Sequence, residues 1–314
     1  MWTSPKSIPR ASGLRELGTL ALLFGAGCAE APPVVPAVPA TLVRPASFAG
    51  SRFGTNQWVE CTAGDLPIVI SVPHGGTQRP AAIPDRTLGS TVADANTIQL
   101  ATALSAALSK RTGRAPYVIV NHLHRKKLDA NREIEEAAQG NADAERAWRE
   151  YHAFVDEACA DVALRFGNGL YIDLHGHAHA VARVELGYLL TARELDLSDA
   201  ELTRRGAGEK SSSSALLRSR GSDFIEVLRG PTSLGGFLSS EFACVPSPSC
   251  PSPGQDEYFN GGYSTRVHAS AIPGVQIEAP LPGVRDTPEN RARFGRSLAK
   301  AIESFLLVHE GIRL

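Results

Sequence analysis

Four short apolar segments constrain the fold of this chain, because each has the length and composition of a buried strand and leads into residues that bind metals or transfer protons. In a sheet of parallel strands, ligands bind where the chain leaves the carboxyl ends of the strands. The segments therefore predict one site at one edge of a sheet. They are 66–72, which precedes His74; 116–120, which precedes the polar loop 121–133; 169–174, which precedes His175; and 274–278, which ends in Glu278.

Helical patterns separate these segments. Apolar residues recur at helical spacing in 92–110 and 148–166, and a third helix is predicted after the last strand, with Thr287 as its N-cap and Pro288 in its first turn. Strands that alternate with helices predict a three-layer αβα domain with a mixed, mostly parallel sheet. The chain of 314 residues is long enough for one sizeable core, and we expect a single catalytic domain over 51–314.

Residues 1–28 have the pattern of an export signal. Basic residues precede the apolar run 17–26, which ends in small residues before Cys28. The run is too short for a stable membrane-spanning helix, and a cysteine after Ala-Gly is typical of bacterial lipoproteins. We expect export to the cell envelope with a lipid anchor on Cys28; ordinary signal cleavage into the periplasm and no processing are the alternatives. Segment 29–50 is rich in Ala, Pro and Val, which favours an extended tether.

The charge balance argues against nucleic acid as a partner. The chain has 32 Lys and Arg against 33 Asp and Glu, a formal net charge of -1, and no sustained basic stripe. Because phosphate contacts dominate nucleic-acid affinity, such a chain lacks the required electrostatic surface. We expect a small-molecule partner, with the membrane contacted only through the N-terminal lipid anchor.

The cysteines after Cys28 leave two pairings open. Cys244 and Cys250 flank a Pro/Ser loop and suit a small disulfide ring in an oxidising compartment. Cys61 and Cys159 either pair or remain separate buried thiols. The Cys-x-x-Cys spacing of a structural zinc knuckle does not occur in the sequence.

Three side chains are candidate metal ligands. His74 follows a buried strand and precedes two glycines, which let backbone approach the site closely. Asp94 has two interpretations: with Thr91 it forms a capping box at a helix start, or it faces the sheet edge as a ligand. His175 leaves its strand first and is preferred over its two histidine neighbours at 177 and 179, which an extended chain places on the same side.

The chain resembles the N-formylglutamate amidohydrolase family, which belongs among the zinc-carboxypeptidase-like hydrolases of phosphorylase/hydrolase-like fold. The resemblance runs from residue 66 to the C-terminus and depends on six motifs in order. They are Leu-Pro-Ile-Val-Ile-Ser-Val-Pro-His-Gly-Gly at 66–76, the helix start at Asp94, Arg125 with Leu-Asp-Ala-Asn-Arg at 128–132, Asp-Leu-His at 173–175, Gly-Gly-Tyr-Ser-Thr-Arg at 261–266, and Val-Gln-Ile-Glu at 275–278.

The resemblance implies a catalytic zinc site. Its ligands would be His74, Asp94 and His175, and three protein ligands leave an open position for water. Glu278 would be the catalytic carboxylate that accepts the proton of the attacking water and returns it to the departing amine.

The resemblance also implies how a substrate is held. Asn131 and Arg132 look like the Asn-Arg pair with which zinc carboxypeptidases grip a substrate carboxylate. Arg125 would stabilise the oxyanion, and the Gly-rich loop would bring Arg266 to the substrate. For Arg132 and Arg125, the alternative interpretation is that each forms an ordinary surface salt bridge.

The sequence departs from the family at two positions near the site and in its predicted export signal. Ala-Pro-Leu-Pro follows Glu278 where members commonly have a tyrosine, and Gly-His rather than Ser follows His175. We therefore expect a zinc amidohydrolase that cleaves an amide adjacent to a free carboxylate, in an N-acyl or N-formyl amino acid. The alternatives are a carboxypeptidase-like hydrolase of poly-γ-glutamate or cell-wall peptide, and a surface lipoprotein that binds without catalysis.

Overall fold

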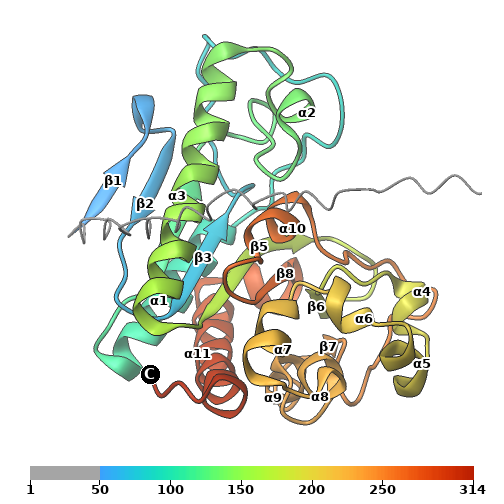
Figure 1. Cartoon of the computed structure of the whole chain (residues 1–314). Coiled ribbons are helices and arrows are strands. Elements are labelled where there is room, and N and C mark those ends of the chain that lie inside the picture. Colours follow the sequence, from blue (N-terminus) through green and yellow to red (C-terminus); the bar gives the residue numbers. More distant parts are fainter. Residues whose placement is uncertain (1–49) are drawn as a thin grey trace, which may run out of the picture. The chain divides into compact units, whose positions relative to one another are not determined.

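The computed structural model describes residues 50–314, so the predicted export signal and all of the predicted tether except Gly50 lie outside the described residues. Within this part of the chain, eight strands form one sheet in the order β1-β2-β4-β3-β5-β8-β6-β7 (Figure 1). The strands are β1 Ser51–Phe53, β2 Val59–Thr62, β3 Ile68–Val72, β4 Tyr117–Asn121, β5 Leu170–His177, β6 Val184–Gly187, β7 Cys244–Val245 and β8 Gly274–Pro280.

The centre of the sheet consists of the four strands predicted from the sequence. β4, β3, β5 and β8 are neighbours and run parallel to one another. The pairs β1–β2, β2–β4 and β6–β8 are antiparallel, and β7 runs parallel to β6. The sheet is mixed and mostly parallel, and the predicted α/β fold class is confirmed.

Helices cover both faces of this sheet, which explains why its central strands are apolar throughout. Every residue of β3 and β8 is buried, as expected where neither face meets water. On one face the strands share a core with α1, α11 and the short helices α4 to α9; on the other they pack against α2 and α3, and Figure 1 shows α3 crossing in front of the sheet with α11 behind it. The helices are α1 Thr97–Thr112, α2 Ile134–Ala138, α3 Ala142–Phe166, α4 Ala192–Leu195, α5 Asp199–Arg204, α6 Ala207–Lys210, α7 Ser214–Arg220, α8 Phe224–Arg229, α9 Leu234–Leu238, α10 Tyr263–His268 and α11 Pro288–Phe305, with short helical turns at η1 Thr55–Gln57, η2 Leu281–Arg285 and η3 Leu306–Glu310.

The ends of the long helices follow local sequence signals. The side chain of Thr287 accepts a hydrogen bond from the Asn290 amide at the start of α11, as predicted. At the end of α3, Gly167 has φ 75°, a left-handed conformation that glycine adopts readily. The start predicted for the first helix was wrong, because α1 begins at Thr97 rather than at residue 92.

The described cysteines are free thiols. Cys61 and Cys159 are buried in the same apolar core and do not pair, so the interpretation as separate buried thiols holds. The disulfide ring between Cys244 and Cys250 is not formed. Among residues 50–314, no helix combines the length and apolar character that a membrane crossing requires.

Candidate metal centre

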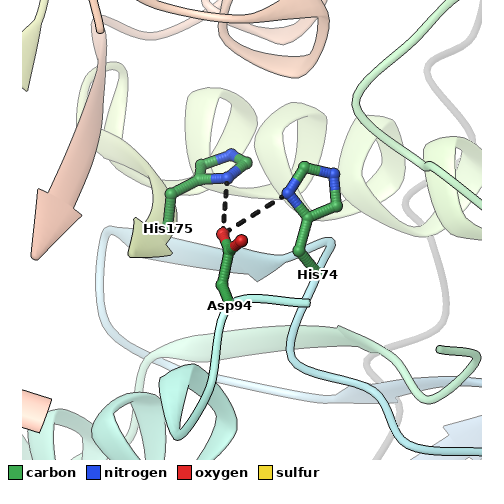
Figure 2. A group of neighbouring side chains, drawn as sticks. All are labelled: His74, Asp94 and His175. Atoms are coloured by element: carbon green, nitrogen blue, oxygen red, sulfur yellow. Dashed lines mark hydrogen bonds and ion pairs between the residues drawn. The ribbon is translucent and has the colours of Figure 1, made fainter. Parts of the chain in front are cut away.

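Three of the predicted site residues meet at the carboxyl ends of β3 and β5. His74 follows β3, His175 lies in β5, and Asp94 immediately precedes the turn that enters α1. Asp94 Oδ2 lies 3.4 Å from His74 Nδ1 and 3.2 Å from His175 Nδ1. Figure 2 draws both contacts as dashed lines. We call these three residues the His-Asp-His cluster, and all three are buried.

The structure contradicts the capping-box interpretation of Asp94. Its Oδ2 atom accepts a hydrogen bond from the backbone amide of Gly176 at 3.1 Å and faces both histidines. The helix start uses the backbone carbonyl of Asp94 instead, which accepts from the amide and hydroxyl of Thr97. A capping box between Thr91 and Asp94 is therefore not formed.

Each histidine of the cluster is held from behind by a buried carboxylate. His74 Nε2 lies 2.6 Å from Asp129 Oδ1, and His175 Nε2 lies 3.2 Å from Asp173 Oδ2. A carboxylate that accepts the Nε2 proton fixes the tautomer and leaves the Nδ1 lone pair available. The two Nδ1 atoms consequently face the same point beside Asp94.

The cluster fits a divalent metal such as zinc. His74 Nδ1 is buried and has no hydrogen-bond partner among the described residues, so its lone pair is unused. Two ligand atoms of a tetrahedral zinc site, each about 2.0–2.1 Å from the ion, lie about 3.3 Å apart. The distances of 3.4 and 3.2 Å from Asp94 Oδ2 to the two histidine nitrogens match that separation.

The charges around the cluster favour an ionised Asp94 and a protonated His175. Burial opposes the ionisation of Asp94, but His74 and His175 hold its pKa well below the ordinary value. Burial likewise opposes the charge on His175, while Asp173, Asp94 and Glu278 raise its pKa well above the ordinary value. The raised pKa of His175 favours its protonated form, and a metal that bound there would displace a proton.

Glu278 lies on β8 beside the cluster. It is the register partner of His175 on β5 and of Glu185 on β6. Its Oε1 atom is 4.0 Å from His175 Nδ1 and accepts a hydrogen bond from Gln276, whereas Oε2 is buried without a partner among the described residues. Burial, together with the nearby carboxylates, raises the pKa of Glu278 to about 8 against the opposing effect of His175.

The cluster lines a cavity of about 600 Å³ together with Glu278, Arg125, Asn131 and Arg132. Arg125 Nε donates to Asp129 Oδ2 at 2.9 Å, so this guanidinium also helps to position the carboxylate behind His74. The side chain of Asn131 is buried; it accepts from the Ser264 amide and lies against His175 Nε2. Arg132 is more accessible and also contacts Glu136.

The remaining predicted substrate residue is not brought to the site. Arg266 in α10 has an exposed side chain that pairs with Glu133 and lies over the ring of Tyr263. It is not part of the cavity wall formed by the described residues. The loop 259–262 before it does line the cavity, and its Gly262 lets the backbone pass close to Asn131.

Sequence reasoning gave no role to three side chains that build the site. Asp129 and Asp173 position the histidines, and Arg285 donates to the carbonyls of Ala279 and His177, tying the ends of β8 and β5 together. A Cβ atom on Gly176 would lie 2.2 Å from Arg285 Cζ, so a larger residue there would displace this guanidinium from the strand. Asp-x-His in a strand was an available signal for Asp173, because alternate residues share a face.

The chain is similar to several solved protein structures. No family model and no curated protein sequence matches the chain. The chain is similar to N-formylglutamate amidohydrolase from Ralstonia eutropha JMP134, with 16% identity, TM-score 0.46, and coverage of 84% of this chain and 100% of that one. It is similar to gene product Atu2144 from Agrobacterium tumefaciens, with 14% identity, TM-score 0.50, and coverage of 82% and 100%.

A third similar structure is an N-acetylmuramyl-L-alanine amidase from Mycobacterium abscessus, with 12% identity, TM-score 0.30, and coverage of 76% of this chain and 98% of that one. At such identities a structural likeness concerns the fold. What the cavity does must therefore be argued from its own side chains.

Proposed function

We propose that this protein is a zinc-dependent amidohydrolase of the N-formylglutamate amidohydrolase type, which cleaves an amide adjacent to a free carboxylate. The observation that carries the proposal is the His-Asp-His cluster, with its two carboxylate-held histidines, in the same cavity as the buried carboxylate of Glu278. A site that only bound ligand would have no need of a proton acceptor beside a metal.

Each of these residues has a separate role in the proposed reaction. His74, Asp94 and His175 would hold the ion, which when bound polarises a carbonyl and acidifies water. In its ionised form, Glu278 accepts a proton from the attacking water through its unpartnered Oε2. Asp129 and Asp173 keep the histidines oriented.

Arg132 and Arg125 are the proposed contacts for anionic oxygen atoms of the substrate. Both guanidinium groups line the cavity, and Arg132 is the more accessible of the two. A guanidinium fork matches the planar geometry of a carboxylate. The side chain of Asn131 is committed to Ser264 and His175 and supports the wall of the cavity.

The size of the cavity favours a second candidate substrate class. A volume of about 600 Å³ exceeds the needs of a formyl amino acid and lies within the range of sites for drug-sized ligands. Three wall residues are exposed apolar side chains: Val92 is 74% exposed, Phe259 46% and Leu281 37%. Longer N-acyl amino acids and short peptides with a free carboxylate are therefore the alternative substrates.

One experiment separates these candidates. The metal-free protein, reconstituted with zinc, is assayed on N-formyl-L-glutamate, on longer N-acyl amino acids and on short γ-glutamyl peptides. Zinc-dependent hydrolysis of any of these supports the proposal, and the order of kcat/KM values selects the substrate class. Failure to hydrolyse any of them after zinc binding is demonstrated would contradict it. Export and a lipid anchor on Cys28 remain proposals from the sequence.

A further inference from the structure

A second histidine–carboxylate pair lines the same cavity. His179, two residues beyond the end of β5, has its Nδ1 atom 2.9 Å from Oε1 of Glu185 on β6. Glu185 is completely buried, and its other oxygen accepts a hydrogen bond from the Phe259 amide at 2.8 Å. The ring of His179 is 12% exposed and forms part of the cavity wall. Glu185 therefore holds this imidazole in a fixed orientation.

His177, which lies beside this pair, does not complete a metal site with His179 and Glu185. Ligand atoms of His177, His179 and Glu185 lie within 4.8 Å of one another. However, His177 Nε2 lies 2.8 Å from the Arg183 carbonyl, and its Nδ1 accepts from the His179 amide. Both nitrogens of His177 are therefore occupied, which leaves two residues where a protein metal site ordinarily has three or more.

The pair instead has the arrangement of a proton-transfer dyad. Because Nδ1–H donates to a buried carboxylate, the other nitrogen, Nε2, is the atom that exchanges protons. Nε2 of His179 has no hydrogen-bond partner among the described residues and is not buried. It is thus free to contact a molecule in the cavity.

The pair lies next to the proposed catalytic carboxylate. Glu185 and Glu278 are register partners on the antiparallel strands β6 and β8. Side chains that are directly opposite on such strands project to the same face, with Cβ atoms about 4.5–5.5 Å apart. Glu278 and His179, two different proton-transfer groups, both line the cavity, and Glu185 is the register partner of Glu278 and the hydrogen-bond partner of His179.

We propose that His179 is a further catalytic residue, which donates the proton to the departing nitrogen, and that Glu185 is its positioning residue. This inference rests on the proposed amidohydrolase function. It assigns the two proton transfers to two side chains instead of having Glu278 perform both.

The proposed step balances as follows. An oxygen–carbon bond forms between water and the substrate carbonyl, and Glu278 takes one proton of the water. The carbon–nitrogen bond then breaks with its electron pair on nitrogen, which takes a proton from Nε2 of the His179 imidazolium. The proton on Glu278 restores His179, and the carboxylic acid product releases its own proton at neutral pH.

The test compares an amide with the matching ester, because an alkoxide leaves without prior protonation more readily than an amine does. The probes are N-formyl-L-glutamate and its ester counterpart O-formyl-2-hydroxyglutarate, assayed with the zinc-loaded full chain. We expect His179→Gln to lower kcat on the amide by about 10²–10⁴-fold and on the ester by less than about 10-fold. Zinc content stays unchanged, and Glu278→Gln loses activity on both probes.

The positioning role of Glu185 has its own readout. In Glu185→Gln the side-chain amide presents a donor to Nδ1 and favours the wrong tautomer of His179. We expect a lower kcat on the amide with KM and ester hydrolysis preserved. A structural defect would change KM and affect both probes together.

The outcomes distinguish this inference from the function on which it rests. If His179→Gln loses activity equally on amide and ester, or retains full amide activity, the inference is wrong while the amidohydrolase function stands. If the zinc-loaded wild type hydrolyses neither probe, the proposed function for this substrate fails and the role of His179 fails with it.

Discussion

His74 Nε2 lies 2.6 Å from Oδ1 of Asp129, a carboxylate that has no exposure to solvent. This contact turns the opposite nitrogen of the ring, Nδ1, toward Asp94. Burial opposes ionisation of Asp129, but His74, Arg125 and Arg132 hold its pKa below the ordinary value. The contact therefore joins the loop after β4 to the His-Asp-His cluster.

The first prediction concerns this contact. Asp129→Asn should weaken zinc binding about 10- to 100-fold, because the amide no longer fixes the tautomer of His74. Zinc affinity is measured by competition with a chelating dye. The control is Asp85→Asn, which alters an exposed carboxylate paired with Lys127. Unchanged zinc affinity in Asp129→Asn would contradict the role of Asp129 in orienting His74 for metal binding.

The second prediction concerns substrate binding. Arg132→Ala should raise KM for a carboxylate-bearing N-acyl amino acid about 10- to 100-fold, because a charged hydrogen-bonding group contributes about 1.5–3 kcal/mol. KM for the corresponding carboxamide should change little. Arg266→Ala is the matched control, since that side chain is exposed and paired with Glu133. Equal increases in KM for acid and amide would reject carboxylate capture by Arg132.

The third prediction concerns stability and pH. Both carboxylate oxygens of Glu310 are buried without a partner among the described residues. Burial raises its pKa from 4.5 to about 7, against the opposing effect of Arg220. Between these pH values the unfolded chain has released the proton that the folded chain keeps, so the free energy of unfolding falls as pH rises. The fall approaches about 3 kcal/mol at pH 7 and above.

Glu310→Gln removes this titration. Urea unfolding at pH 4.5, 6 and 8 should show that the variant gains stability relative to wild type as pH increases. Glu209→Gln, a change at an exposed carboxylate, serves as the control. If the free energy of unfolding changes with pH in the same way for wild type and Glu310→Gln, the pKa of Glu310 is not raised in the folded protein.

The sequence predicted the fold well because its strongest signal is local. A strand covered on both faces is a continuous apolar run, and the four central strands appear in the sequence as such runs. His74, His175 and Glu278 were found because they lie at the ends of these runs, and the structure brings them together with Asp94. Their binding of a metal remains a prediction.

The parts that sequence reasoning missed depend on tertiary contacts. Asp129 and Arg285 lie outside the strands, and their roles become visible only when the loop after β4 and the turn after β8 meet the histidines. Arg266 was selected for its Gly-rich loop, but one turn of α10 directs it to the surface. The backbone between 92 and 96 is not helical, which allows Asp94 to face the cluster.

The metal content of the purified chain shows whether His74, Asp94 and His175 form a metal centre. Wild type, His74→Ala, Asp94→Ala and Glu278→Gln are each offered zinc, freed of excess ion and measured by elemental analysis. We expect about one zinc per chain in wild type and in Glu278→Gln, and the loss of zinc in the two ligand variants. A wild-type chain that retains no zinc, or ligand variants that retain as much as wild type, would contradict this metal centre.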